Sequence, residues 1–304
     1  MTRMTDATVT FIDPKRLSKR AVRRFFDAFE QRESLSESLS DDNEGFEGDG
    51  IALMIGTEVH GLYRYKPFTS LQADATLYFP YGGTLIPNRH TSLHQALIEK
   101  LILELKTDSK ADLIICLDRQ PMQQSDRIVE DEAFWLALGF SPLDVQIFYQ
   151  GEVKYENTQD NSGFLVSKYE GGNDAINKQL CRMYREAYKG RVGIPDITSD
   201  SINMQLSIPS CSYLIMHHND QLIGQVTLFI SDRECYVDSI YVTRSYWGTG
   251  AADTLTRSLF DYAKTKECRT VSGTAASNNQ ASRALMERFG LVAQYQVKRM
   301  SLSI

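Results

Sequence analysis

Long hydrophobic runs are absent from this sequence of 304 residues. A transmembrane helix needs about 20 consecutive apolar residues, and no segment approaches that length. The stretch from Met1 to Asp6 also lacks the apolar core of a secretory signal peptide. From these absences we expect a cytoplasmic protein that has no membrane partner.

Cysteine is scarce and scattered. An even set of cysteines in a short secreted chain would indicate a disulfide framework, and closely spaced pairs would indicate a zinc site. Neither arrangement occurs here, so we expect reduced thiols and no bound metal. The five cysteines are Cys116, Cys181, Cys211, Cys235 and Cys268.

Basic residues do not predominate either. The chain carries 33 lysines and arginines against 39 acidic residues, a formal net charge of −6, and no Lys/Arg run stands out. A nucleic-acid-binding surface would concentrate basic residues on one face, so that partner class is disfavoured. Hydrophobic residues make up 42% of the chain, which is enough for folded cores. The length suits two domains of about 100–200 residues each.

Hydrophobic periodicity predicts alternating strands and helices in the first half of the chain. In residues 16–32, Val22, Phe25, Phe26 and Phe29 fall on one stripe of a helix. Residues 34–49 are polar, acidic and glycine-containing, which indicates a surface loop. The other predicted elements are strands at 7–12, 51–55, 59–63, 76–79 and 113–117, and helices at 92–106 and 131–138.

The same order of elements recurs in the second half. Residues 151–163 are polar and aperiodic, and we interpret them as a linker between two domains, 1–150 and 164–304. Predicted strands cover 164–169, 213–216, 222–230, 235–242, 271–274 and 292–303, and predicted helices cover 174–188, 199–206, 252–264 and 280–289.

Two pairs of glycines support an internal repeat. Gly61 in Val-His-Gly and Gly224 in Leu-Ile-Gly are 163 residues apart, and Gly139 in Leu-Gly-Phe and Gly290 in Phe-Gly-Leu are 151 residues apart. The offset drifts only slightly across the domain, as changes in loop length would produce. We therefore predict two copies of one α+β fold, each a mixed, mostly antiparallel sheet flanked by helices.

A glycine-rich turn joins a strand to a helix late in the second half. The strand predicted at 235–242 is followed by the segment 247–252, with sequence WGTGAA, which opens a helix. Glycine has no Cβ and lets the backbone approach a ligand closely, and the N–H groups at the head of a helix attract anions. The turn therefore has the character of a diphosphate site. A tight connector that needs glycine for its φ angles would show the same pattern.

Two other nucleotide-binding motifs do not fit this turn. A Walker loop would need Gly-Lys followed by Ser or Thr, and that triplet is absent. A dinucleotide fingerprint would normally sit in the first strand-to-helix turn of its domain, with an acidic residue about 20 residues further on. The turn at 247–252 comes late in its domain, so both classes are disfavoured.

At this turn the sequence resembles the GNAT superfamily of acyl-CoA-dependent N-acyltransferases. The turn of that family reads Val-x-x-x-x-Arg/Gln-Gly-x-Gly-x-Gly/Ala. A second family signature, Asn-x-x-Ala followed by Leu-Tyr-Glu-x-x-Gly-Phe, is similar to Asn279 and Ser282 followed by segment 285–291, LMERFGL. The residues that match the turn are Val242, Trp247, at the Arg/Gln position, Gly248, Gly250 and Ala252.

The resemblance implies that the second domain binds acetyl-CoA. Backbone groups in the segment Ile240–Val242, which includes Tyr241, would pair with the pantetheine arm, which adds to the sheet like a short strand. Asn279 would hydrogen-bond the same arm, beside Ser282. Trp247 would remove one positive charge near the phosphates. The diphosphate would be held by amides of Gly248, Thr249, Gly250, Ala251 and Ala252.

In the family, an amine attacks the acyl thioester directly, and an acid often protonates the departing thiolate. That acid is commonly the tyrosine of the second signature, a position that Met286 occupies here. Tyr295 or Tyr241 could replace it, a water could do so, or the thiolate could leave unassisted. These alternatives remain open from the sequence.

Asp238 is the candidate base, acting through a water. Strand alternation gives it the same parity as Tyr236 and Ile240, so we expect the three side chains on one face. A surface or structural carboxylate is the alternative interpretation. His217 and His218 precede the Asn-Asp turn of a predicted hairpin, where a solvent-exposed hairpin end is the simpler reading.

Alignment of the halves places residues 85–93 opposite the glycine-rich turn. Thr91 and Leu93 then occupy the glycine positions, where a Cβ should obstruct the approach of a ligand. We predict that the first domain keeps the fold, binds CoA weakly or not at all, and helps to shape the acceptor pocket. Alternatively, Arg89, His90 and Ser92 form a phosphate site of another kind.

The expected function is transfer of an acetyl group from acetyl-CoA to a primary amine, of a small molecule or a protein, by the second domain. A non-catalytic protein that binds or senses acyl-CoA is the alternative, and a scaffold with neither activity is a third reading. We expect a monomer, which is a pseudo-dimer of domains, or a homodimer. The loop around Gly190 to Ile197 and the contacts between the halves would decide the acceptor.

Overall fold

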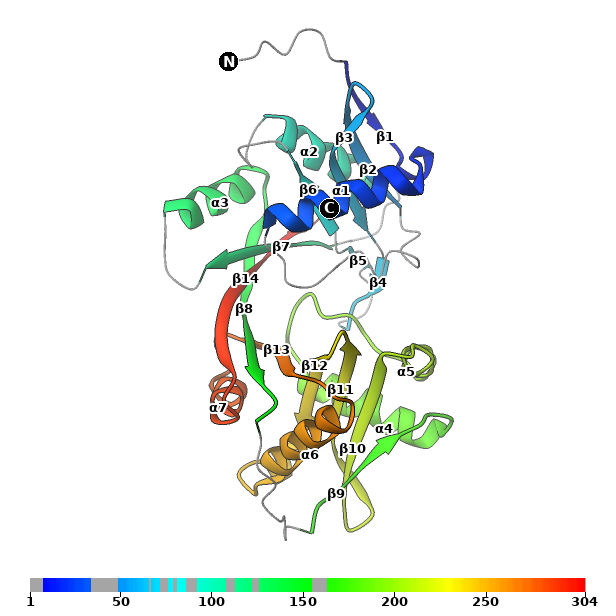
Figure 1. The fold of residues 1–304 in the computed structure, drawn as a ribbon, viewed down its shortest axis with the longest axis vertical. Helices are drawn as coiled ribbons and strands as arrows, with labels where there is room; N and C mark the ends of the chain where they lie inside the picture. Colours follow the sequence, from blue (N-terminus) through cyan, green and yellow to red (C-terminus); the bar gives the residue numbers. More distant parts are fainter. Residues whose placement is uncertain are drawn as a thin grey trace. The chain divides into compact units, whose positions relative to one another are not determined.

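The computed structural model describes residues 8–33, 49–65, 67–71, 76–78, 81–85, 92–107, 113–121, 126–154 and 163–303 (Figure 1). The chain divides into two compact units. The first comprises Met1–Cys116, Ser125–Pro142 and Met300–Ile304, and the second comprises Leu117–Gln124 and Leu143–Arg299.

These units differ from the predicted domain boundary at 150. Residues 143–150 belong to the second unit, because strand β8 (Ser141–Glu152) pairs antiparallel with β13 (Thr270–Ala276). The pairing runs from Gln146 opposite Ala276 to Glu152 opposite Thr270. The hydrophobic pattern had indicated no strand here, and the predicted linker at 151–163 overlaps the end of β8.

The first unit contains an antiparallel sheet with helices on both faces. Its strand order is β1-β2-β3-β6. Side chains of β2 alternate between two cores: Ala52 packs with Phe25 and Phe26 of α1, whereas Ile51 and Leu53 belong to the core that includes residues of α2. The bounds are β1 Val9–Ile12, η1 Pro14–Arg16, α1 Lys19–Glu33, β2 Asp49–Ile55, β3 Glu58–Tyr65, β4 Pro67–Thr69, β5 Thr76–Tyr78, β6 Tyr81–Thr84, α2 Ser92–Thr107, β7 Leu113–Pro121 and α3 Asp126–Ala137.

The second unit contains a mixed sheet in which the strands follow the order β14-β8-β13-β12-β11-β10-β9. β12 and β13 are parallel, whereas β8/β13, β12/β11, β11/β10 and β10/β9 are antiparallel. The predicted mixed, mostly antiparallel α+β domain is therefore confirmed. The bounds are β9 Leu165–Tyr169, α4 Asp174–Ala187, α5 Ser199–Leu206, β10 Cys211–His218, β11 Gln221–Ser231, β12 Glu234–Val242, η3 Arg244–Tyr246, α6 Ala251–Thr265, α7 Gln280–Arg288 and β14 Val292–Ser303.

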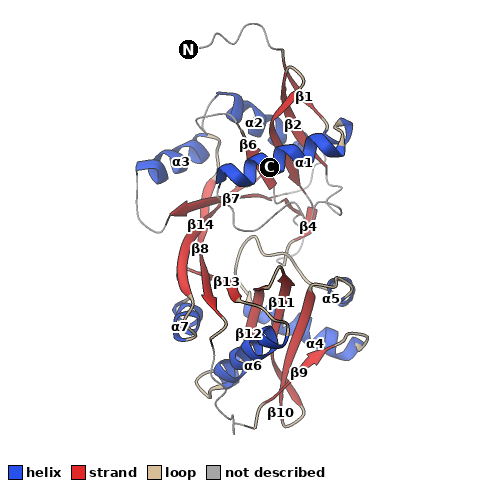
Figure 2. Cartoon of the chain, in the orientation of Figure 1, coloured by secondary structure: helices blue, strands red, loops and turns tan. Residues whose placement is uncertain are grey.

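Helices cover both faces of this second sheet (Figure 2). On one face, Leu255 and Phe260 of α6 and Met286 of α7 pack on a core that includes Val237 of β12. On the other face, α4 and α5 form a separate core with β10, in which Leu180 and Ile202 are fully buried. The hairpin between β10 and β11 turns at Asn219 and Asp220, both at positive φ, as its sequence predicts.

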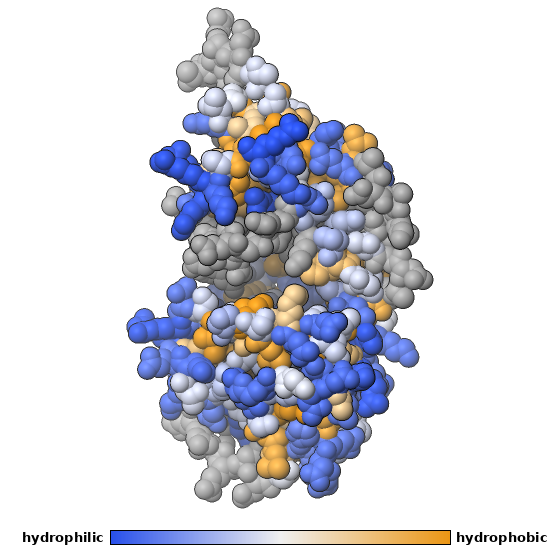
Figure 3. All heavy atoms as spheres, turned by 90° about the vertical axis from the view of Figure 1, so that its right-hand side faces the viewer, coloured by the Kyte–Doolittle hydropathy of each residue, from blue (hydrophilic) through white to orange (hydrophobic). Residues whose placement is uncertain are grey.

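The surface of the described residues is largely polar. The face drawn in Figure 3 carries mostly hydrophilic side chains with smaller hydrophobic groups among them. Exposed large apolar residues come from different elements, for example Leu103 of α2 and Leu165 of β9. No helix in the described part of the chain is long and apolar enough to cross a membrane.

The cysteines of the second unit lie in its interior. Cys181, Cys211, Cys235 and Cys268 are buried, and each carries a free thiol. Burial raises the pKa of all four thiols, to about 11 for Cys211 and about 12 for Cys235. They are therefore protonated at neutral pH and poor nucleophiles. Within the described ranges, no three His, Cys, Asp or Glu residues gather where they could hold a metal ion.

Candidate functional site

A β-bulge interrupts strand β12 at Asp238. In the pairing with β11, Thr227 lies opposite Ser239 and Leu228 lies opposite Val237, so Asp238 is the extra residue. A bulge reverses the alternation of side chains along its strand. Before the bulge Val237 packs on the α6 side of the sheet, and after it Ile240 does so.

The prediction that Asp238, Tyr236 and Ile240 share one face of the sheet is therefore wrong for Ile240. Asp238 shares the α4 side of the sheet with Tyr236, but Ile240 packs against the opposite core. Alternation along an uninterrupted strand would have put all three together. The bulge arises from the register with β11, which the local sequence of β12 does not display.

The sheet also opens at this point. β12 and β13 pair in parallel from Glu234 opposite Thr270 to Val237 opposite Gly273, and the pairing ends there. Both strands continue, β12 to Val242 and β13 to Ala276. In the described part of the chain, the edge of β12 that faces β13 has no strand partner over residues 238–242. An extended ligand can hydrogen-bond to such an edge as an added strand does.

The glycine-rich turn lies at the end of this open edge. Gly248 and Gly250 have φ angles of 77° and 88°, in the left-handed region that side chains disfavour. A Cβ at either position would meet no atom within 4 Å, so the glycines serve the backbone conformation and leave open space. The requirement for glycine is thus conformational and does not come from packing.

Backbone N–H groups are available at the head of α6. The amides of Gly248, Gly250, Ala251, Ala252 and Asp253 donate to no acceptor among the described residues, and the helical ladder starts with Thr254 N to Gly250 O at 3.0 Å. Such groups, together with the partial positive charge of the helix start, attract an anion. The amide of Thr249 is directed back to Tyr246 O at 3.4 Å, and its hydroxyl donates to the same carbonyl at 2.7 Å.

A hydrogen bond from Trp247 links this turn to the end of β12. Its indole Nε1 donates to Val242 O at 2.9 Å, while 66% of the residue remains exposed. The guanidinium of Arg244 lies 5.7 Å from the centre of the indole ring. Trp247 removes a charge from the usual Arg/Gln position, and Arg244 places a cation beside it. The sequence comparison had missed Arg244.

An apolar hollow lies between α6 and α7, over the point where the strands part. Its lining comes from β12, β13, the two helices and the segment that follows α7. Met286, at the position of the family's usual tyrosine, is buried and lines the hollow, so no proton donor occupies that place. The lining residues are Val237, Ile240, Thr256, Leu259, Phe260, Val271, Leu285, Met286, Phe289 and Leu291.

Asn279 and Ser282 lie at the start of α7. The Asn279 side-chain oxygen accepts from Ser282 N at 3.2 Å and caps the helix, and the Asn279 amide N–H donates to Ala276 O at 2.8 Å. Asn279 is exposed and Ser282 is half-buried. The cap holds the Asn279 side chain at the end of β13, next to the open edge.

Asp238 faces the end of α4. Its side chain is exposed to solvent, yet desolvation by the surrounding protein raises the pKa of its carboxyl above the ordinary value. Its negative charge adds to burial in raising the pKa values of Tyr184, Tyr188 and Tyr213. These three tyrosines therefore lie near the candidate base.

Of the two tyrosines predicted as proton donors, Tyr241 lies on the α4 side of β12 and Tyr295 lies on another strand. The Tyr241 hydroxyl donates to Leu180 O at 3.1 Å and ties β12 to α4. Tyr295 is on strand β14, and its ring stacks on that of Phe148 with 4.6 Å between the ring centres. Since β14 is three strands from β12, with spacings of about 4.8 Å, Tyr295 is about 14 Å from Asp238 by this measure. The structure therefore does not bring Tyr295 together with the bulge.

The two histidines lie at the hairpin end of β10. The centre of the His218 ring lies 5.1 Å from that of Phe164 and 5.6 Å from that of Tyr246. The His218 Nδ1 lies 3.4 Å from Gly163 O. This end of β10 pairs with the start of β9, away from the bulge row that contains Tyr213 and Thr227. The hairpin-end interpretation is the better one for His217 and His218. Residues 86–91, the counterpart of the turn in the first unit, lie outside the described residues.

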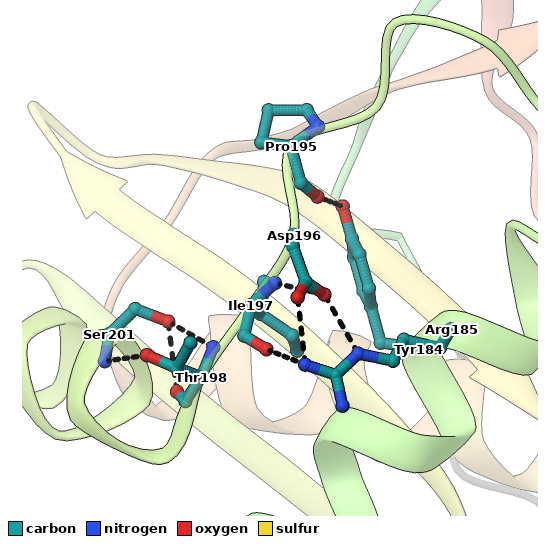
Figure 4. Close-up of polar contacts among 7 residues, drawn as sticks. All are labelled: Tyr184, Arg185, Pro195, Asp196, Ile197, Thr198 and Ser201. Atoms are coloured by element: carbon teal, nitrogen blue, oxygen red, sulfur yellow. Dashed lines mark hydrogen bonds and ion pairs between the residues drawn. The ribbon is translucent and has the colours of Figure 1, made fainter. Parts of the chain in front are cut away.

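Polar contacts join the loop between α4 and α5 to both helices (Figure 4). Arg185 forms a two-pronged ion pair with Asp196, at 2.9 and 2.7 Å, and also donates to Ile197 O at 3.2 Å. The Tyr184 hydroxyl donates to Pro195 O at 3.1 Å. The side chains of Thr198 and Ser201 form a reciprocal capping box at the start of α5. This is the loop expected to shape an acceptor pocket.

Comparisons with known proteins agree with this architecture. Residues 177–291 match the profile of the Acetyltransferase (GNAT) family. No curated protein sequence matches the chain. Among solved structures, a tandem GNAT protein from the clavulanic acid biosynthesis pathway superimposes with a TM-score of 0.73 at 11% identity, over 97% of this chain and 98% of that one.

Two further structures share the fold. A GCN5-related N-acetyltransferase from Sphaerobacter thermophilus gives a TM-score of 0.68 at 15% identity, over 96% of this chain and 95% of that one. A glucosamine N-acetyltransferase region in a fungal multi-domain beta-N-acetylglucosaminidase gives 0.74 at 8% identity, over 98% of this chain and 38% of that one. Residues 177–291 therefore match the GNAT acetyltransferase family, and the chain as a whole has the fold of a tandem GNAT protein.

Proposed function

We propose that the second unit transfers the acetyl group of acetyl-CoA to a primary amine. One observation carries the proposal: the bulge at Asp238 and the end of β12–β13 pairing at Val237 coincide, beside a helix start with available amides. An open strand edge suits an amide-containing arm, and the helix start suits a diphosphate. Together they match the two chemical parts of a CoA thioester.

Donor binding would use main-chain groups above all. The diphosphate would meet the N–H groups of residues 250–253 at the head of α6. The pantetheine arm would extend along residues 238–242, over the apolar hollow that Met286 and Phe289 line. Asn279, held by its cap, would offer its side-chain amide to the same arm.

The reaction would proceed by direct attack. The amine nitrogen forms a bond to the thioester carbon while the carbon–sulfur bond breaks, and one proton must leave the nitrogen. Asp238 would take that proton through a water, and its raised pKa brings it closer to the operating pH of a general base. The thiolate would take its proton from water, because Met286 carries none and the Tyr241 hydroxyl is engaged with Leu180.

Release of CoA thiol tests this proposal. The full chain is mixed with acetyl-CoA and a panel of primary amines, and free thiol is measured against reactions without amine or protein. Amine-dependent release supports the proposal. Tight acetyl-CoA binding without release across the panel would contradict it and would favour the sensor alternative, which the buried Met286 at the usual acid position supports.

Arg288 is expected to assist donor binding by neutralising Asp253. Asp253 lies in the first turn of α6, where an unpaired carboxylate would repel a diphosphate. Arg288, at the end of α7, binds both of its oxygens, at 2.7 and 2.9 Å. We expect Arg288→Leu to weaken acetyl-CoA binding about tenfold, which corresponds to about 1.4 kcal/mol, measured by calorimetry at low salt.

The double variant Arg288→Leu/Asp253→Asn separates two roles for the arginine. If Arg288 acts through Asp253, removal of both charges restores most of the affinity. If the double variant binds as weakly as Arg288→Leu, Arg288 contacts the donor itself and the neutralising role is rejected. Both residues of the pair are partly exposed, so folding should change little.

A further inference from the structure

The Trp247 indole lies on the open edge of β12. Val242 lies directly opposite Gly224 of β11. In the next pair, Thr243 N donates to Ile223 O at 2.7 Å. Hydrogen-bonded and non-hydrogen-bonded pairs alternate along an antiparallel ladder, so the Val242 carbonyl points away from β11. Trp247 Nε1 donates to this carbonyl at 2.9 Å, and the indole therefore lies at the edge of β12 that faces β13.

This place is next to the phosphate-bearing part of the proposed donor. β12 runs from the bulge at Asp238 to Val242, and the glycine-rich turn follows. With the thioester at the bulge, the diphosphate reaches the head of α6 and the phosphoadenosine lies beyond it. Trp247 immediately precedes Gly248 of the turn and is largely exposed. Its ring is therefore within the part of the site that the nucleotide end of the donor would occupy.

Arg244 is held on this indole. Its guanidinium carbon lies 5.7 Å from the centre of the Trp247 ring, and its carbonyl accepts from Trp247 N at 3.1 Å. The second contact closes the turn of η3, so backbone and side chain together fix the arginine beside the indole. Arg244 is exposed, and its guanidinium has no hydrogen-bond or ion-pair partner among the residues that the structure describes.

The surroundings favour an anion at this arginine. The acidic side chain in the first turn of α6, Asp253, is already bound through both oxygens by Arg288. A phosphate at the turn would thus meet the N–H donors of Arg244 beside the available main-chain amides. A guanidinium binds phosphate through paired, charge-assisted hydrogen bonds, and stacking on an aromatic ring gives it a preferred orientation.

We infer that Arg244 binds a phosphate group at the nucleotide end of the donor and that Trp247 positions it. The inference rests on the proposed function, because the donor is the CoA thioester named there. In this chain the cation of the usual Arg/Gln position has moved three residues back, and the indole that replaces it supports the moved charge. The diphosphate and the 3′-phosphate of CoA share this chemistry, and donor analogues distinguish them.

Analogues that lack successive phosphates test the role of Arg244. Calorimetry on the full chain compares CoA, 3′-dephospho-CoA and pantetheine, which has no phosphate. We expect Arg244→Met to weaken CoA binding about tenfold at low salt, and pantetheine binding by less than about twofold. A loss that persists with 3′-dephospho-CoA assigns the contact to the diphosphate. A loss that disappears with it assigns the contact to the 3′-phosphate.

Relocation of the charge tests the role of Trp247. Trp247→Leu should weaken CoA binding about as much as Arg244→Met, and the double variant should lose little more, because the two residues act as one unit. Arg244→Met combined with Trp247→Arg returns a cation to the usual position of the family and should recover most of the affinity. If this double variant binds no more tightly than Arg244→Met, the relocation of the charge is rejected.

Two further variants make the result specific. Arg244→Lys should recover part of the affinity that Arg244→Met loses, because it keeps the charge and loses the paired geometry. Arg233→Met removes an exposed arginine at the other end of β12 and should leave CoA affinity unchanged. The unfolding temperatures of both Arg244 variants should match that of the parent chain.

The outcomes distinguish this inference from the proposed transfer. Equal CoA affinities of the parent chain and Arg244→Met, or equal losses for CoA and pantetheine, would overturn the role of Arg244 whether or not thiol is released. A phosphate-dependent loss in a chain that releases no thiol with any amine would support Arg244 and overturn the transfer. A parent chain that binds no CoA would overturn both.

Discussion

Replacement of Gly250 by valine is expected to abolish detectable acetyl-CoA binding while both units stay folded. Gly250 has a φ of 88° and immediately precedes α6. A β-branched residue disfavours that conformation by roughly 1–2 kcal/mol, so the turn should relax and its amides should diverge. Loss of two or more charge-assisted hydrogen bonds corresponds to at least about a 100-fold loss of affinity.

Gly172→Val is the matched control for this substitution. Gly172 also has a positive φ, of 79°, and an added Cβ there would meet no atom within 4 Å. It lies between β9 and α4, away from the turn. Both variants should lose similar stability by calorimetry, but only Gly250→Val should lose the acetyl-CoA-induced rise in unfolding temperature. A Gly250→Val chain that binds acetyl-CoA like its parent would remove the basis of the donor site.

Replacement of Asp238 by asparagine is expected to lower kcat/KM for the amine about 100- to 10,000-fold, with acetyl-CoA affinity unchanged. Asparagine has nearly the same shape and cannot accept the proton. In the parent chain, activity should fall as the pH drops through the carboxyl pKa, which burial raises above its ordinary value. This acidic limb should vanish from the pH profile of the variant.

The same raised pKa predicts the effect of Asp238→Asn on stability. Because the folded-state pKa lies above the unfolded value, the folded chain favours the protonated acid, and that stabilisation is lost as the pH rises through the folded pKa. The variant should therefore be at least as stable as the parent chain at neutral pH. Asp261→Asn, an exposed change on α6, should alter neither rate nor stability. An unchanged acidic limb in Asp238→Asn would exclude Asp238 as the base.

The elements of the proposed donor site could be predicted because they are local. The strand before the turn, the glycines at positive φ and the helix after it each depend on a few adjacent residues. The hairpin at Asn219 and Asp220 is predictable for the same reason. The second signature marked α7 and its cap at Asn279.

Other parts of the site depend on pairs of residues that are distant in the sequence. The bulge at Asp238 reflects its register with β11, and the position of Tyr241 reflects its bond to Leu180, 61 residues away. Arg288 meets Asp253 across 35 residues. No periodicity within one segment contains these relations, so the sequence could predict neither the side of the sheet that Ile240 takes nor the separation of Tyr295 from Asp238.

By itself, the sequence determined the kind of fold and the place of the glycine-rich turn, because strand alternation, helix periodicity and the conformational freedom of glycine act within a few residues. Only the tertiary structure decided that β8 belongs to the second sheet, that β12 leaves β13 after Val237, and that Arg191 lies beside the Tyr188 ring. Strand pairing and ion pairing join residues that are far apart in the chain, and their energies depend on positions that folding alone establishes.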